Sequence, residues 1–399
     1  MLFLQSSLRR TILLSCLVAA FLTPSTAEAA DGATKEIDIC MGEKKRSWIW
    51  PFNQKCQGME RKARVYIPEL PDNKIPAKVP LLLNLHALGS NGFVQQVYTQ
   101  FDDIADNEKF VVAYPEGIAK ARVGTPLAAP KLLPLFSFNA GGCCAEACNP
   151  DAINPPKGSK NKAPIDDIGF FKELVKHIQE VTSKENNFII DTERIYATGM
   201  SNGGFMTNRV ACEMSDIVAA VAPVAGPLMN EAGDGTAPFM WGADPFVCAP
   251  GRPVPLLHFH SNEDAVVPFE GSKDFGFPSI PSSIEKWRVI NGVKDVEPVI
   301  TYDEGLTSCK SYGPGTSSSV TLCEMISKSH CWPGEGIAMC GNGIGNQYIW
   351  DFFKNHTLGG GFVGVEDGVT KESSIPSASI TPKAAKSSKS SSSNVGGEL

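Results

Sequence analysis

Hydrophobic residues occur along this chain in short continuous runs that alternate with stretches of helical periodicity. The clearest run covers residues 79–86, and such continuous runs are typical of strands buried on both faces of a parallel sheet. Residues 64–68 read instead as an edge strand. The pattern predicts strands over residues 64–68, 79–86, 110–114, 217–224, 254–260, 299–302 and 320–326.

Amphipathic segments between these runs indicate helices. They cover residues 94–107, 165–182, 205–214, 284–290 and 346–355. Because strands and helices alternate, the sequence predicts an α/β fold with a mainly parallel central sheet and helices on both faces. The irregular stretch 116–164 is long enough to indicate a functional loop or a lid, and residues 226–252 read as a Gly/Pro-rich crossover.

The two ends of the chain depart from this pattern. In residues 1–29, a basic pair and an apolar run precede Ala27-Glu28-Ala29, which indicates a cleaved secretory signal peptide; an uncleaved anchor is the alternative. Residues 30–60 read as an N-terminal extension stapled to the body by a disulfide, residues 61–358 as the main domain, and residues 359–399 as a Ser/Lys-rich disordered tail. We therefore expect a secreted, extracellular protein.

Cysteine usage agrees with export, because oxidising compartments favour disulfides. The chain has 12 cysteines, and one of them, Cys16, lies in the signal segment. The remaining number is odd, which leaves one cysteine free or paired between chains. A metal site is the competing interpretation, but no CxxC pair or interleaved histidine supports it. The pairs predicted from spacing are Cys40–Cys56, Cys212–Cys248, Cys309–Cys323 and Cys331–Cys340.

Composition narrows the class of partner. The 399 residues are 42% hydrophobic and 20% charged, which is ordinary for a soluble globular protein. A net charge of −7 gives no basic surface for nucleic acid. We expect no nucleic-acid partner, no metal or cofactor, and no membrane contact after signal cleavage.

The strongest chemical signal is Gly199-Met200-Ser201-Asn202-Gly203, which follows a β-type run and precedes a helical one. A Gly-x-Ser-x-Gly turn in this context acts as a nucleophile elbow, a strained turn that presents the serine hydroxyl at the top of a sheet. Gly199 and Gly203 have no Cβ to obstruct the close passage of strand and helix. A glycine-rich loop with an idle serine is the alternative.

A nucleophilic serine needs a base, and α/β-hydrolases place serine, acid and histidine in that order along the chain. Four histidines follow Ser201. His356 reads as a solvated position, and His258 and His260 precede any acid in a strand-end loop. His330, in a loop just after a late strand, is therefore the candidate base, with a surface-loop histidine as the alternative.

The acid should follow an earlier strand of the sheet. Asp264, in the loop after residues 254–260, is the candidate; Glu263 is the alternative acid and Asp303 a third choice. The oxyanion hole needs two N–H donors, and chain order points to Asn202 and Leu88.

Six short motifs then resemble one family. They are FNAGGCC at 138–144, IDDIGF at 165–170, GMSNGG at 199–204, RPVPLLHFH at 252–260, HCWPG at 330–334 and IWDFF at 349–353. In this order they resemble the secreted poly(3-hydroxybutyrate) depolymerase and feruloyl esterase group of α/β-hydrolases, found among carbohydrate esterases. The resemblance implies an α/β-hydrolase catalytic domain over residues 61–358 that needs no cofactor. By position it matches Ser201 to the nucleophile, Asp264 to the acid and His330 to the base.

Three positions depart from the family's pattern. Ala87 stands where the family has glycine after the strand-end histidine, here His86. His260-Ser261-Asn262 replaces His-Gly-Thr, and Ser329 replaces the glycine before the catalytic histidine. The triad is complete, but these changes leave room for altered specificity or weak activity. His86 reads as a structural residue that orients its loop.

The resemblance implies a secreted serine esterase, with feruloyl or acetyl esters of plant cell-wall polysaccharide as the first expectation. A poly(3-hydroxybutyrate) depolymerase is the alternative substrate class, and a non-catalytic secreted binding protein on a hydrolase scaffold is the alternative of another kind. The expected partner is a polymeric ester. Phe138 and Trp332 are candidates for stacking on a feruloyl ring or a sugar, with plain packing as the equal alternative.

Overall fold

We describe the protein from a computed structural model. The described residues are 32–42, 44–46, 54–56, 59–70, 76–120, 135–142, 165–230, 246–334, 339–340, 344–360, 365–366 and 369–370. The predicted signal peptide, most of the predicted tail, and Cys143, Cys144 and Cys148 lie outside these residues.

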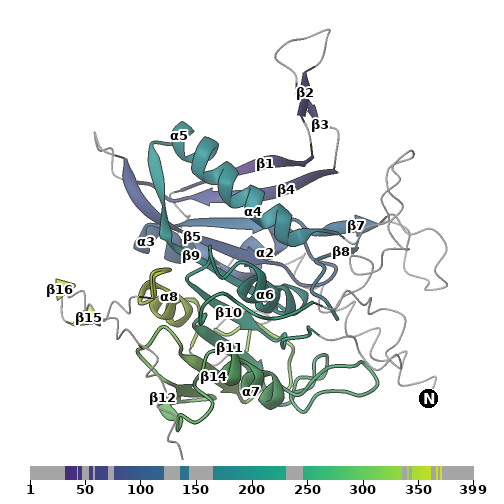
Figure 1. The fold of residues 1–399 in the computed structure, drawn as a ribbon, viewed down its shortest axis with the longest axis vertical. Helices are drawn as coiled ribbons and strands as arrows, with labels where there is room; N and C mark the ends of the chain where they lie inside the picture. Colours follow the sequence, from purple (N-terminus) through teal and green to yellow (C-terminus); the bar gives the residue numbers. More distant parts are fainter. Residues whose placement is uncertain are drawn as a thin grey trace, which may run out of the picture.

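A 10-stranded sheet forms the centre of the molecule (Figure 1). Its strands are β1 (Ala33–Met41), β4 (Met59–Ile67), β5 (Ala77–Leu85), β6 (Val111–Pro115), β9 (Phe188–Met200), β10 (Ala220–Val224), β11 (Leu256–Ser261), β12 (Val299–Glu304), β13 (Thr307–Tyr312) and β14 (Val320–Met325). They run in the order β1-β4-β6-β5-β9-β10-β11-β14-β13-β12. All pairs from β6 to β14 are parallel, and the two strands at each end of the sheet are antiparallel. The predicted α/β-hydrolase fold is confirmed.

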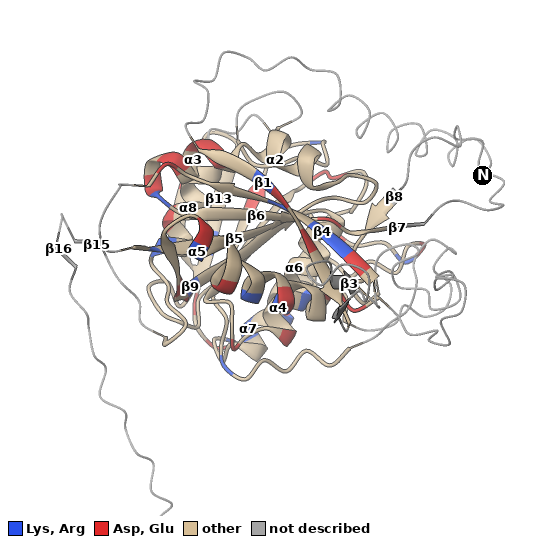
Figure 2. Ribbon diagram, turned by 90° about the horizontal axis from the view of Figure 1, so that it is seen from above, with Lys and Arg blue, Asp and Glu red and all other residues tan. Residues whose placement is uncertain are grey.

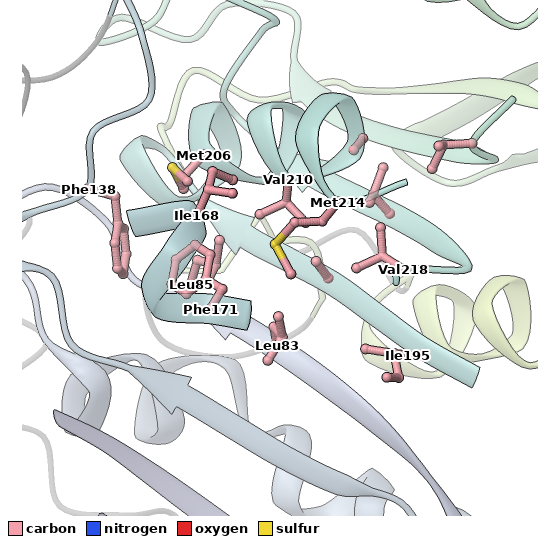
Figure 3. Close-up of a cluster of buried hydrophobic side chains, with 14 of the residues drawn as sticks. Leu83, Leu85, Phe138, Ile168, Phe171, Ile195, Met206, Val210, Met214 and Val218 are labelled. Carbon is pink, nitrogen blue, oxygen red and sulfur yellow. The ribbon is translucent and has the colours of Figure 1, made fainter. Parts of the chain in front are cut away.

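Helices cover both faces of this sheet, as predicted (Figure 2). They are α2 (Gly92–Thr99), α3 (Phe101–Glu108), α4 (Asp167–His177), α5 (Ser183–Glu185), α6 (Asn202–Glu213), α7 (Ile280–Ile290) and α8 (Asn346–Lys354). Apolar side chains of α4, α6 and α7 pack on one face and those of α3 and α8 on the other. Figure 3 shows the apolar side chains between α4, α6 and the sheet, among them Val210 of α6, Met214 just after this helix, and Leu83 of β5.

The N-terminal extension is part of the sheet, which corrects the prediction of an edge strand at residues 64–68. β1 pairs antiparallel with β4 along its whole length and takes the edge position, while β4 lies inside, against β6. The polar composition of residues 31–61 hid this strand, because an edge strand keeps one side in water. Glu36 and Asp38 are exposed on it, and charges on an edge disfavour pairing with another chain.

Two more elements differ from the predictions. The helix expected over residues 94–107 is broken at Gln100, whose φ is 53°, into α2 and α3. The pattern did not reveal the break because its apolar face resumes at Phe101. β13 was not predicted, because its buried positions are Thr307, Cys309 and Ser311 rather than aliphatic residues.

All four predicted disulfides are present: Cys40–Cys56, Cys212–Cys248, Cys309–Cys323 and Cys331–Cys340. The first joins the end of β1 to the small hairpin of β2 (Lys44–Arg46) and β3 (Gln54–Cys56), so it closes a loop inside the extension, which the pairing of β1 with β4 attaches to the main domain. The other short pairs are β7 (Ile118–Lys120) with β8 (Leu135–Ser137) and β15 (Val365–Glu366) with β16 (Val369–Thr370). Among the helices that the structure describes, none has the length and apolar character needed to cross a membrane.

Candidate active site

Ser201 stands on the turn between β9 and α6, with φ 55° and ψ −117°. Residues other than glycine seldom adopt positive φ, so this strained backbone marks a functional position. Two backbone bonds hold the turn: the Ser201 N–H donates to Val224 O (2.9 Å), and the Ser201 carbonyl accepts from the Phe205 N–H (2.9 Å). The predicted strand–turn–helix around the serine is therefore present.

The two elbow glycines sit where backbones touch. A Cβ on Gly203 would lie 2.1 Å from the carbonyl oxygen of Leu85, and one on Gly199 would lie 2.7 Å from the carbonyl of Gly203. Real Cβ atoms do not approach other atoms this closely. β5, β9 and α6 thus meet without room for a side chain, which is the role predicted for both glycines.

Asp264 and His330 meet at the carboxyl ends of the adjacent parallel strands β11 and β14. His330 Nδ1 lies 2.7 Å from Asp264 Oδ2. An ionised carboxylate only accepts hydrogen bonds, so in the neutral form of the ring Nδ1 carries the proton and Nε2 keeps a lone pair. Nε2 is buried and has no hydrogen-bond partner within the described part of the chain. Because parallel strands end at one edge of a sheet, Ser201 after β9 lies at the same edge as this pair.

The alternative acids lie apart from His330. Glu263 is exposed and faces Lys328, with 3.5 Å between its Oε2 and the lysine Nζ. Asp303 is exposed on β12, the outermost strand at the far end of the sheet. Of the three candidates weighed from the sequence, only Asp264 has a bond to His330.

Asp264 is held by more than the histidine. Its Oδ1 accepts from the N–H groups of Val266 (2.8 Å) and Val267 (2.9 Å). Burial acts to raise the pKa of Asp264, but the charge and hydrogen bond of His330, with smaller contributions from His260 and a backbone N–H, outweigh it and bring that pKa below its usual value. The carboxylate is therefore ionised at neutral pH and fixed in one orientation.

The other histidines after Ser201 are buried. His258 and His260 lie side by side on β11, where burial lowers the pKa of His260 to about 4 and brings that of His258 well below its usual value. The prediction that His356 is solvated was wrong: it is 3% exposed, and burial lowers its pKa to about 4. The end of α8 turns inward there, because the His356 carbonyl accepts a bond from the Tyr196 hydroxyl of β9 (2.9 Å).

Of the two predicted oxyanion donors, Asn202 belongs to the elbow, and Leu88 comes shortly after Leu85, whose carbonyl touches Gly203. Asn202 opens α6, so its N–H has no acceptor inside the helix. Leu88 lies in the loop after β5, which is shaped by bonds from the Ser90 N–H to Ala87 O (3.0 Å) and from the Gly89 N–H to Phe136 O (2.8 Å). That these two N–H groups receive an oxyanion stays a proposal.

His86 secures this loop, as expected for a structural residue. The Gly117 N–H donates to His86 Nε2 (2.9 Å), which places the imidazole proton on Nδ1, and Nδ1 in turn donates to Ala87 O (2.8 Å). Burial lowers the pKa of His86 to about 4, so the ring is neutral and its bonds persist across the physiological range.

Phe138 and Trp332 pack in the interior, and their predicted stacking on substrate is corrected accordingly. Both side chains are 0% exposed. Phe138 packs against the His86 ring (4.5 Å between centroids) and lies beside Phe171 (Figure 3). Trp332 faces Phe101 edge-on, and its indole N–H donates to Asn346 Oδ1 (2.8 Å). Their rings stabilise the loops around the site and present no face to a ligand.

One supporting network was not predicted. The side chain of Asn202 bonds both the N–H (2.7 Å) and the carbonyl (3.0 Å) of Phe138, and Asp167 accepts from the next N–H, that of Asn139 (2.6 Å). Asp167 also forms a buried ion pair with Arg61 (2.5 Å). No local pattern could reveal these contacts, because the partners lie far apart in sequence. They fix the loop 138–142 against the elbow.

No group of three or more histidine, cysteine, aspartate or glutamate residues placed to hold a metal occurs in the described ranges. The arrangement of Ser201, Asp264 and His330 suits nucleophilic attack on an acyl group with proton transfer through an imidazole.

No protein-family model matches the chain. Feruloyl esterase B of Piromyces equi is 28% identical over 292 residues, which cover 70% of this chain and 42% of that protein. The bifunctional acetylxylan esterase/xylanase XynS20E of Neocallimastix patriciarum is 28% identical over 219 residues, 55% of this chain and 24% of that one. Poly(3-hydroxyalkanoate) depolymerase C of Paucimonas lemoignei is 26% identical over 152 residues, 38% of this chain and 29% of that one. The chain spans less than half the length of these relatives, and their names confirm its resemblance to the poly(3-hydroxybutyrate) depolymerase and feruloyl esterase group of α/β-hydrolases.

Proposed function

We propose that this protein is a serine esterase that hydrolyses carboxylic esters through Ser201, His330 and Asp264. The observation that carries the proposal is the 2.7 Å bond between His330 Nδ1 and Asp264 Oδ2, which leaves Nε2 as a proton acceptor at the sheet edge that bears the strained serine.

The steps follow from these groups. Ser201 Oγ attacks the ester carbonyl while His330 Nε2 takes its proton, and Asp264 stabilises the imidazolium. The N–H groups of Leu88 and Asn202 bind the oxyanion. His330 then gives its proton to the leaving alcohol. Water, deprotonated by the same imidazole, hydrolyses the acyl-enzyme and restores Ser201.

The proposed substrates are feruloyl or acetyl esters of plant cell-wall polysaccharide, which makes the partner a polymeric ester. Two relatives support this, one named a feruloyl esterase and one an acetylxylan esterase. Action on an extracellular polymer needs secretion. The disulfides support an oxidising compartment, and the signal segment over residues 1–29 supplies the export route.

The direct test compares wild type with Ser201→Ala on p-nitrophenyl acetate and on methyl ferulate, with Ser282→Ala, an exposed serine of α7, as the matched control. We expect loss of hydrolysis for Ser201→Ala alone. Undiminished hydrolysis by purified Ser201→Ala would show that the nucleophile is misassigned. A fluorophosphonate probe also separates this function from a non-catalytic binding protein, because only a serine enzyme becomes labelled at Ser201.

A polyester substrate is the second candidate, and the similarity to poly(3-hydroxyalkanoate) depolymerase C favours it. Release of ferulate or acetate from arabinoxylan, measured beside release of hydroxybutyrate from a polymer film, distinguishes the two. We expect the polysaccharide to be the better substrate by kcat/KM. Faster release from the film would assign the polyester instead.

A further inference from the structure

Two buried histidines outside the triad form a line that ends at the triad acid. His258 and His260 lie two residues apart on β11, so both rings project from the same face of the sheet. The rings are parallel within 7°, with 5.5 Å between centroids, and neither is more than 1% exposed. The proposed reaction uses neither ring.

Their hydrogen bonds run in one direction. His260 Nε2 lies 2.8 Å from the carbonyl oxygen of Val267, which can only accept, so His260 carries a proton on Nε2. Burial keeps the ring neutral, so its Nδ1 is an acceptor. His258 Nε2 lies 3.3 Å from that nitrogen and must donate to it. The carbonyl of Val267 therefore fixes the tautomer of His260, and His258 supplies the matching donor to its Nδ1.

Val267, whose carbonyl accepts the hydrogen bond from His260, also forms a hydrogen bond to Asp264. The Val267 N–H donates to Asp264 Oδ1 (2.9 Å), while its carbonyl receives the bond from His260 (2.8 Å). One residue is thus bound through its N–H to the carboxylate and through its carbonyl to the imidazole. The loop that carries Asp264 is tied back onto β11 through His260.

The same bond keeps His260 from competing for the carboxylate. His260 Nε2 lies 3.7 Å from Asp264 Oδ2, the oxygen that accepts from His330 at 2.7 Å. With its proton directed at Val267, the ring donates no hydrogen bond to the carboxylate. Oδ2 is left to His330, whose imidazolium needs it when the serine proton is transferred.

We propose that His260, held in its Nε2–H tautomer by the Val267 carbonyl and by a hydrogen bond from His258 to its Nδ1, is a positioning residue that orients Asp264 and through it His330. The proposal rests on the esterase function above. A small displacement of a catalytic group costs on the order of 100-fold in rate, so loss of this tie should lower kcat by about 10- to 100-fold. Substrate binding does not involve the tie, and KM should change little.

The test compares His260→Gln with His260→Leu. Glutamine keeps an N–H donor near the place of Nε2, whereas leucine fills the space without one. Each variant is assayed for kcat and KM on p-nitrophenyl acetate, for the rate of fluorophosphonate labelling, and for Tm. We expect the leucine variant to lose kcat and labelling rate, and the glutamine variant to recover most of both. Equal kcat for wild type and a folded leucine variant would overturn the proposal.

A second measurement needs no substitution, which matters because leucine here leaves buried polar groups unpaired. Nitrogen-15 NMR of histidine-labelled wild type reports which ring nitrogen carries the proton. We expect His260 to be neutral and protonated on Nε2 at pH 7; a proton on Nδ1, or on both nitrogens, overturns the proposal. If the esterase function itself is wrong, folded wild-type protein will not be labelled by the fluorophosphonate at Ser201. That result would refute the positioning role of His260 as well.

Discussion

Replacing Gly203 by alanine should disable the elbow while leaving most of the fold in place. The added Cβ would lie 2.1 Å from the carbonyl oxygen of Leu85 and 2.6 Å from its carbon. Leu85 pairs with Gly199 across the two central strands, so the obstructing atoms belong to buried backbone that cannot swing aside.

The magnitude follows from that distance. Real Cβ atoms keep at least 3.0 Å from other atoms, so β5 and α6 must separate by about 0.9 Å. Overpacking of a buried contact costs about 1–3 kcal/mol, and removing a helical glycine gains roughly 1 kcal/mol, so the net loss is up to about 2 kcal/mol. The net loss corresponds to a fall in Tm of a few degrees. A shift of this size at the nucleophile should lower kcat/KM by about 100-fold.

The assay pairs Gly203→Ala with Gly251→Ala. A Cβ on Gly251 meets nothing nearer than 3.8 Å, at Ser215 Oγ, so this control should stay within about 0.5 kcal/mol of wild type and keep full activity. Both variants are measured for Tm and for hydrolysis of p-nitrophenyl acetate. If Gly203→Ala kept wild-type kcat/KM, the claim that close backbone approach sets the serine would be refuted.

Three further predictions concern the triad acid, the disulfide beside His330 and the buried histidines. Asp264→Asn should lower kcat by about 10,000-fold, because the amide favours the wrong tautomer of His330. A loss under tenfold in steady-state assays would contradict the pairing. Replacing both Cys331 and Cys340 by serine should lower kcat by about 10- to 100-fold, because their disulfide fixes the backbone at Cys331, the residue after His330. An unchanged kcat would show that the disulfide contributes only to stability. Buried histidines that are neutral in the folded state but become protonated in the unfolded state should each lower the free energy of unfolding by about 1.4 kcal/mol per pH unit as pH falls from 6.5 toward 4. Asp102, whose pKa burial raises to about 6, has the opposite effect and offsets one of these histidines. Urea titrations that show a constant or rising free energy of unfolding over this pH range would refute the prediction. These histidines are His86, His258, His260 and His356.

What could be predicted from the sequence was local or set by chain order. The elbow is readable because its glycine spacing and its flanking strand and helix lie within about twenty residues. The pairing of Asp264 with His330 follows from the order of strands in the sheet, and short sequence separations suggested the disulfides.

What could not be predicted depends on contacts between distant residues. The burial of Phe138 comes from α4 and from the His86 loop, and that of His356 from Tyr196 on β9. β1 and β13 lack apolar alternation because one is an edge strand and the other buries small polar side chains. An aromatic near a catalytic motif therefore says nothing by itself about substrate.

The hydrogen bonds of Trp332 to α2 and α8 limit which substitutions near the site can leave its geometry intact. The Trp332 N–H donates to the Tyr98 hydroxyl of α2 (3.0 Å), and its indole reaches Asn346 at the start of α8. α2 directly follows the Leu88 loop, so the loop that carries His330 and the loop proposed to bind the oxyanion share one support. Substitutions in α2 would move the base and the oxyanion donors together. Substitutions that change substrate specificity are therefore better tolerated in segments that do not contact α2 or Trp332, because they leave the positions of His330 and the oxyanion donors unchanged.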